Sequence, residues 1–128
     1  MPIWRRSMYE LTVTDSFAAA HVLKGYEGGC EKLHGHTFKI EVTLVSGALD
    51  KIGFVVDFTQ VKEKLKAFLK ELDHSYLNED VPYFKTNNPT TENLAKYIYQ
   101  GFSKASQPFK IKQVKVWESD DCCVAYHE

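Results

Sequence analysis

The chain has 128 residues, of which 44% are hydrophobic and 26% charged, with a formal net charge of -1 at pH 7. This length corresponds to one domain with a core of its own, so residues 1–128 are expected to form a single domain. The near-neutral charge argues against nucleic acid or an anionic membrane surface as the main partner, and the composition excludes a low-complexity chain.

The three cysteines, Cys30, Cys122 and Cys123, have neither the even count nor the spacing of a secreted disulfide scaffold. No long apolar run follows the first residues, so neither a signal peptide nor a membrane-spanning segment is predicted. We therefore expect a protein of the reducing cytoplasm with no membrane partner.

The first predicted element is a strand from Tyr9 to Ala20 that ends near His21. A glycine-rich loop follows over residues 24–29. Residues 36–45 then alternate between apolar and polar side chains, which predicts a half-buried strand that His34-Gly-His36 opens.

Two helices are predicted in the middle of the chain. Residues 57–72 carry apolar side chains at three- and four-residue steps, with Asp57 placed to cap the helix. A loop is expected through Asn78 and Pro82, and a second helix from Thr91 to Phe102.

Two further strands are predicted near the end of the chain, over residues 110–117, with one break in the alternation, and over 122–126. The order is therefore β-β-α-α-β-β. Strands joined by local connections predict an α+β fold, in which an antiparallel four-stranded sheet carries two helices on one face.

Three histidines form a candidate metal site. Side chains two positions apart on a strand point to the same face, so His34 and His36 can reach one ion. His21 ends the neighbouring predicted strand. Three imidazoles with an open fourth position are typical of a catalytic zinc site, although the same nitrogens also suit copper, nickel or iron.

The alternative to metal binding is that the His-x-His pair is incidental. His127, near the end of the chain, is interpreted as a solvated residue. Cys122 and Cys123 point to opposite sides of a strand, so they cannot bind one ion together.

Five short blocks follow one another along the chain: Phe17–His21, Cys30–His36 (a Cys-x-x-x-His-Gly-His string), Leu72–Asn78, Asn88–Asn93 and Trp117–Ser119. In these residues and in this order, they resemble the 6-pyruvoyl-tetrahydropterin synthase / 6-carboxytetrahydropterin synthase family. Any one block can arise by chance, but together they are highly specific and span nearly the whole chain.

The resemblance implies the tunnelling fold (T-fold), in which three subunits form a barrel. Two trimers then stack into a homohexamer with active sites at subunit contacts. It also implies Zn2+ as cofactor, bound by His21, His34 and His36, and a small-molecule pterin triphosphate, 7,8-dihydroneopterin triphosphate, as substrate.

The resemblance further implies the catalytic residues. Cys30 matches the family's general base, and a thiol near zinc loses its proton more readily than a free one. His74, oriented by Asp73, matches the proton relay, although a histidine after a helix also interacts favourably with the helix dipole. Glu118 matches the residue that anchors the pterin and joins the relay, although a charged residue is also common at an exposed strand end.

Four residues have weaker assignments. Thr90, Thr91 and Glu92 match a segment that contacts the pterin, but the start of a helix also favours these residue types for capping. Glu31, directly after Cys30, matches a second base found in a subgroup that cleaves the substrate to 6-hydroxymethyl-7,8-dihydropterin. The alternative for Glu31 is an exposed loop carboxylate.

The spacing between Cys30 and His34 resembles that of bacterial 6-carboxytetrahydropterin synthases, which feed the queuosine pathway. Chains with both Cys30 and Glu31 resemble dual-function members that also supply folate synthesis. The alternatives are a 6-pyruvoyl-tetrahydropterin synthase, a non-catalytic zinc- and pterin-binding T-fold protein, and an unrelated zinc hydrolase. Retention of Cys30, His74 and Glu118 together argues against a purely binding role.

Overall fold

A computed structural model describes residues 7–25 and 32–128. Its sheet has the strand order β3-β1-β2-β4-β5. Four of these strands pair in antiparallel fashion, and their bounds are β1 Tyr9–His21, β2 His34–Ser46, β4 Ile111–Ser119 and β5 Cys122–Tyr126. The fifth, β3 (Ser75–Tyr76), adds two residues in parallel along the outer edge of β1.

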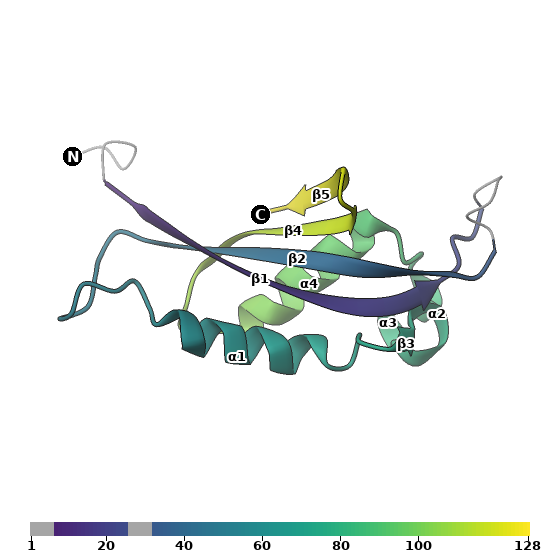
Figure 1. Cartoon of the computed structure of the whole chain (residues 1–128), viewed down its shortest axis with the longest axis horizontal. Coiled ribbons are helices and arrows are strands. Elements are labelled where there is room, and N and C mark those ends of the chain that lie inside the picture. Colours follow the sequence, from purple (N-terminus) through teal and green to yellow (C-terminus); the bar gives the residue numbers. More distant parts are fainter. Residues whose placement is uncertain (1–6, 26–31) are drawn as a thin grey trace.

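Two helices, α1 (Phe58–Leu69) and α4 (Thr91–Ala105), cover one face of the sheet (Figure 1). Val61 and Leu65 of α1 and Ile98 and Phe102 of α4 are fully buried, which matches the helical spacing of apolar residues in the sequence. The predicted α+β fold and its order of main elements are therefore confirmed. Among the helices of the described residues, none has the length and apolar character needed to cross a membrane.

Alternation along the strands places the core between the sheet and the helices. Phe38, Ile40 and Val42 point toward the helices and are fully buried, while the residues between them face the opposite, uncovered side. The predicted break in the alternation of β4 is a bulge. Thr43 pairs with Gln113 and Leu44 with Ile111, so the residue between these two has no partner in the pairing.

The segment between the two long helices differs from the prediction. Instead of one loop, it contains β3 and two short helices, α2 (Leu77–Asp80) and α3 (Pro82–Thr86). Elements of two to five residues are too short to show a periodic pattern, so their sequence reads as a loop. The segment packs beside β1 and brings Asn78 and Asn88 to the end of that strand.

The pairing of β1 with β2 brings the candidate ligands to one end of the sheet. His21 lies directly opposite His34, and Ala19 lies opposite His36. All three histidines point to the side that the helices cover, where His21 contacts the carbonyl of Pro89, the residue before the cap of α4.

Candidate metal centre and active site

Three histidines converge at the end of the β1–β2 pair. Each of His21, His34 and His36 offers one ring nitrogen, and these three nitrogens all lie within 4.8 Å of one another. His21 is fully buried, and the other two are half-buried. The structure thus brings together the three residues that the sequence suggested as metal ligands.

Backbone carbonyls fix the tautomers of two of these rings. The Nδ1 of His21 lies 2.8 Å from the carbonyl oxygen of Pro89, and the Nδ1 of His34 lies 2.7 Å from that of Lys32. Because a carbonyl oxygen can only accept, each Nδ1 carries the proton and donates it. The Nε2 of each neutral ring is then left with a lone pair, and these two Nε2 atoms are 2.9 Å apart.

Two lone pairs at this distance repel unless a proton or a cation lies between them. The third ring also needs a partner, because the Nε2 of His36 is buried and has no hydrogen-bond partner among the described residues. A divalent metal ion satisfies all three nitrogens, and three neutral imidazoles are a common ligand set for such an ion. The residues present therefore fit a bound metal.

Burial also favours the neutral, metal-binding form of His21. It lowers the pKa of His21, because desolvation disfavours the imidazolium form, and the nearby His34 and His36 rings act in the same direction. Neutral imidazole is the form that binds metal ions, so the environment of His21 favours metal over proton.

Glu118, at the end of β4, faces the histidine cluster. One carboxylate oxygen lies 3.8 Å from the Nε2 of His36, and the other accepts a hydrogen bond of 3.0 Å from the hydroxyl of Thr91. The carboxylate is one-third exposed. It is thus held in a fixed orientation beside the cluster and remains open to a ligand.

Asp73 and His74 form a pair at the outer edge of β1. The Nδ1 of His74 lies 3.0 Å from Asp73, whose other oxygen accepts from the backbone N–H of Ala18 at 2.9 Å. That backbone donor, together with His74, holds the pKa of Asp73 below its ordinary value. His74 is 83% exposed and has a positive φ of 58°, a conformation uncommon for a non-glycine residue.

His74 and His36 line one shallow cavity of about 480 Å3, together with residues of the β1 end. His74 therefore lies at the same end of the sheet as the histidine cluster. α1 ends at Leu69, so His74 lies five positions beyond the last residue of that helix, and its ring contacts Asp73.

The remaining predicted site residues have different positions. Thr90 caps α4, accepting a hydrogen bond from the backbone N–H of Asn93. Glu92 is exposed in the first turn of α4. Cys30 and Glu31 lie outside the described residues. Sequence reasoning missed the carbonyl of Pro89 and the bond from Thr91 to Glu118, because neither a backbone acceptor nor a side-chain pairing is visible in a residue pattern.

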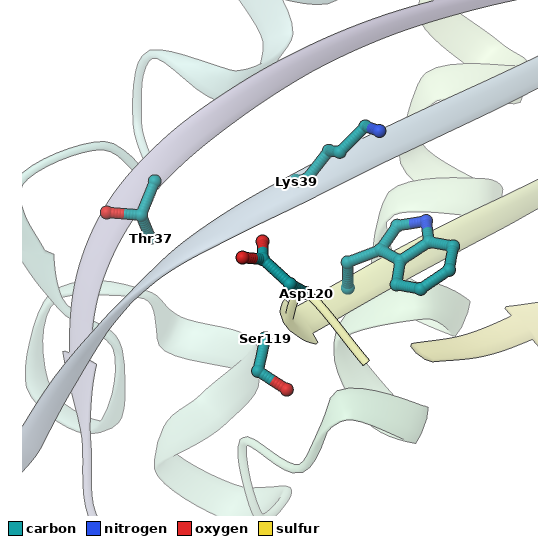
Figure 2. Close-up of a pocket in the computed structure, with 5 residues that line it drawn as sticks. Thr37, Lys39, Ser119 and Asp120 are labelled. Carbon is teal, nitrogen blue, oxygen red and sulfur yellow. The ribbon is translucent and has the colours of Figure 1, made fainter. Parts of the chain in front are cut away.

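A second hollow, of about 140 Å3, lies on the uncovered face of the sheet (Figure 2). Thr37 and Lys39 line it from β2, and Ser119 and Asp120 line it where β4 ends. The fifth lining residue, Trp117, is fixed by Glu41, which accepts a hydrogen bond of 3.0 Å from its indole N–H. None of the predicted site residues that the structure describes lines this hollow, which faces away from the histidine cluster.

Comparison with known proteins places this geometry in a family. The family model of 6-pyruvoyl tetrahydropterin synthase matches residues 10–128. The chain is 41% identical over 107 residues to a dihydroneopterin monophosphate aldolase of Pyrococcus furiosus, covering 83% of this chain and 86% of that one. It is 32% identical to a 6-carboxy-5,6,7,8-tetrahydropterin synthase of Rickettsia bellii, covering 91% and 99%.

Among solved structures, the 6-pyruvoyl tetrahydropterin synthase of Caenorhabditis elegans superposes with a TM-score of 0.86 at 29% identity, covering 98% of this chain and 99% of that one. The chain therefore belongs to the 6-pyruvoyl tetrahydropterin synthase family of pterin-processing lyases. The predicted tunnelling fold is confirmed, whereas its assembly into a barrel stays a prediction.

Proposed function

We propose that the chain is a zinc-dependent lyase that converts 7,8-dihydroneopterin triphosphate to 6-carboxy-5,6,7,8-tetrahydropterin. The observation that carries this proposal is the group of three histidine nitrogens, two with facing lone pairs and one buried without a partner, beside the carboxylate of Glu118. The similarity to the 6-carboxytetrahydropterin synthase of Rickettsia bellii, over nearly its whole length, supports this product.

Each residue has a role in this proposal. His21, His34 and His36 hold the metal, which when bound acts as a Lewis acid and makes the substrate's side-chain hydroxyls and neighbouring C–H bonds more acidic. Glu118, oriented by Thr91, accepts hydrogen bonds from the pterin ring. Cys30 takes a proton as general base.

His74 carries protons between the substrate and solvent. Its exposure and its contact with Asp73 suit this role, and one shallow cavity is lined by both His74 and His36. Thr90 is better explained as a helix cap than as a pterin contact, because its hydroxyl already accepts the N–H of Asn93.

A second activity, carbon–carbon cleavage to 6-hydroxymethyl-7,8-dihydropterin, is favoured by one specific observation. The chain is 41% identical to the Pyrococcus furiosus dihydroneopterin monophosphate aldolase, whose name describes such a cleavage. In this proposal Glu31 is the base for cleavage and Cys30 the base for carboxytetrahydropterin formation. The relative's name also makes the monophosphate a substrate to test.

The test is chromatographic product analysis with 7,8-dihydroneopterin triphosphate and, separately, the monophosphate. The wild type is expected to form both products, Glu31→Ala only carboxytetrahydropterin, and Cys30→Ala only the cleavage product. Each loss is expected to be on the order of hundredfold, as for a removed general base. Metal content, measured in parallel, is expected to be the same in all three proteins.

Three outcomes would change the assignment. Pyruvoyltetrahydropterin as the main product would make the chain a 6-pyruvoyl-tetrahydropterin synthase. A wild type that forms only carboxytetrahydropterin, unaffected by Glu31→Ala, would remove the second activity. A protein that binds zinc and pterin but turns over neither substrate would be a non-catalytic member of the fold.

A further inference from the structure

The outer edge of β1 is paired well beyond the two residues of β3. At Ala18, the backbone N–H donates to Asp73 and the carbonyl accepts from the N–H of His74 at 2.6 Å. Ala20 pairs with Tyr76 of β3. In an extended chain, alternate residues point their backbone N–H and C=O groups to the same edge. The next such groups on this edge therefore belong to Val22 and Lys24.

Two asparagine side chains continue this pairing where no strand is available. The side-chain oxygen of Asn78 accepts the N–H of Val22 at 2.9 Å, and its amide nitrogen donates to the carbonyl of Val22 at 3.0 Å. Asn88 repeats the arrangement on Lys24, with both bonds at 2.9 Å. Each primary amide therefore replaces one residue of a neighbouring strand, because it offers one donor and one acceptor side by side.

Asn88 connects this pairing to the metal centre. The next residue, Pro89, is buried and accepts the Nδ1–H of the ligand His21. Residues 88 and 89 thus hold two points of the chain, the side chain of His21 at the end of β1 and the backbone of Lys24 just beyond it.

The segment itself is anchored to α4. The carbonyl of Asn88 accepts hydrogen bonds of 2.8 Å from the side chain of Asn93 and from the backbone N–H of Thr90, the residue that caps the helix. The orientation of the chain after His21 is therefore set by the N-terminus of α4. The same end of the helix carries Thr91, whose hydroxyl donates a hydrogen bond to Glu118.

We propose that Asn88, supported by Asn78, is a positioning residue of the enzyme. Its amide holds the backbone that follows the metal ligand His21, and so fixes the direction of this segment relative to the metal and to Glu118. This inference rests on the proposed function. Along the sequence, the held segment leads to the proposed base Cys30, six positions after Lys24. The amide contributes no group to the metal or the substrate; it acts through the chain that it holds.

The test compares wild type, Asn88→Ala and Asn88→Asp. Alanine removes both hydrogen bonds, whereas aspartate keeps nearly the same shape but cannot donate to the carbonyl of Lys24. Hydrogen exchange followed by mass spectrometry, on a peptide that contains residues 22–25, is expected to be at least tenfold faster in Asn88→Ala. The metal content of both variants is expected to equal that of the wild type, because all three ligands remain.

Turnover separates a positioning role from a merely structural one. We expect kcat to fall between about tenfold and a hundredfold in both variants, since small displacements of catalytic groups have effects of this size. KM is expected to stay within about threefold, because the metal and the pterin anchor Glu118 are unchanged. Asn87→Ala is the matched control. It removes an amide of the same segment that donates to Tyr83 instead, and it is expected to leave exchange at residues 22–25 and kcat unchanged.

The outcomes decide between the alternatives. Unchanged exchange in Asn88→Ala overturns the proposal directly, as does faster exchange with kcat within twofold of the wild type. Loss of metal together with activity also overturns it, because Asn88 would then support the ligands themselves. If the wild type turns over neither pterin substrate, the proposed function fails, while the exchange measurement still shows whether Asn88 holds the segment.

Discussion

At the scale of single residues, the decisive feature is the protonation of the histidine rings. The carbonyls of Pro89 and Lys32 accept hydrogen bonds from the Nδ1–H groups of His21 and His34, so the Nε2 lone pairs of these two rings face each other 2.9 Å apart. In the absence of a cation this contact is repulsive. The two carbonyls therefore act as partners that orient the ligands toward a metal, as hydrogen bonds to the outer nitrogen commonly do in metal sites.

The first prediction concerns metal content. His34→Ala removes a ligand, and we expect the purified protein to change from about one zinc ion per chain to almost none, with loss of turnover. His74→Ala removes an exposed side chain outside the cluster, so it is expected to keep its zinc but to lose turnover on the order of a hundredfold. Atomic emission on protein purified without added metal measures the first quantity.

His127→Ala serves as the control for both measurements, because His127 is exposed and lies outside the cluster of possible ligands. Full zinc content in His34→Ala would remove His34 from the ligand set. Zinc loss in His74→Ala would instead make His74 part of the metal site rather than a proton carrier.

The sequence predicted the three ligands because His34 and His36 obey the two-residue period of a strand and His21 ends the neighbouring one. It did not predict Asn78 and Asn88, whose side chains bind backbone groups 56 and 64 positions away. Such bonds depend on how the segment between α1 and α4 packs against the end of β1. No local residue pattern encodes them, so only the structure identifies these residues.

At the scale of elements, the N-terminus of α4 organises the site. Its first residues hold Glu118 through Thr91, and the segment just before it holds His21 through Pro89. The cap residue Thr90 closes the helix by accepting the N–H of Asn93 at 3.1 Å. A loss of helical order here is expected to disturb both contacts together.

The second prediction tests whether Thr90 is a cap. Thr90→Ala removes the hydroxyl acceptor and leaves a backbone N–H of α4 without its partner, so the free energy of unfolding is expected to fall by about 1 kcal/mol. Thr90→Ser keeps the acceptor and is expected to stay within about 0.5 kcal/mol of the wild type. Urea unfolding at a fixed protein concentration measures both changes.

A pterin contact would give a different result. If the hydroxyl of Thr90 binds the substrate, Thr90→Ala raises KM severalfold with no change in stability. We expect the stability change instead, because the single hydroxyl is already engaged with the helix.

Long elements could be predicted and short ones could not. Residues 36–45 of β2 and the buried stripe of α1 follow clear periods, so both elements were located within a few residues of their ends. By contrast, β3 exists because two residues, Ser75 and Tyr76, meet the edge of β1. Its formation is a consequence of tertiary packing, as are the two short helices that follow it.

At the scale of the whole molecule, the sheet has two open edges within the described residues. The outer edge of β1 is paired from Ala18 onward, but between Tyr9 and Phe17 it has no strand beside it in the structure. β5 is the last strand on the opposite side. Unpaired edges attract other strands, and two edges on one subunit allow a closed ring of subunits.

The third prediction is that the homohexamer implied by the family resemblance forms with strand pairing across the β1 edge. Light scattering at micromolar concentration is expected to give six times the chain mass of 14.7 kDa. The backbone groups of Ala18 and Ala20 face the outer edge, and the β1–β2 register has no shift, so alternation places the N–H of Thr14 on that edge too.

Thr14→Pro therefore removes one donor from the proposed subunit contact and none from the pairing of β1 with β2, since proline is tolerated on the free edge of a strand. We expect a folded protein, with helical circular dichroism like the wild type, whose mass falls to that of smaller assemblies. Thr14→Ala keeps the N–H and is expected to remain a hexamer. A wild type that scatters as a monomer, or a Thr14→Pro protein that stays hexameric, would show that this edge does not join the subunits.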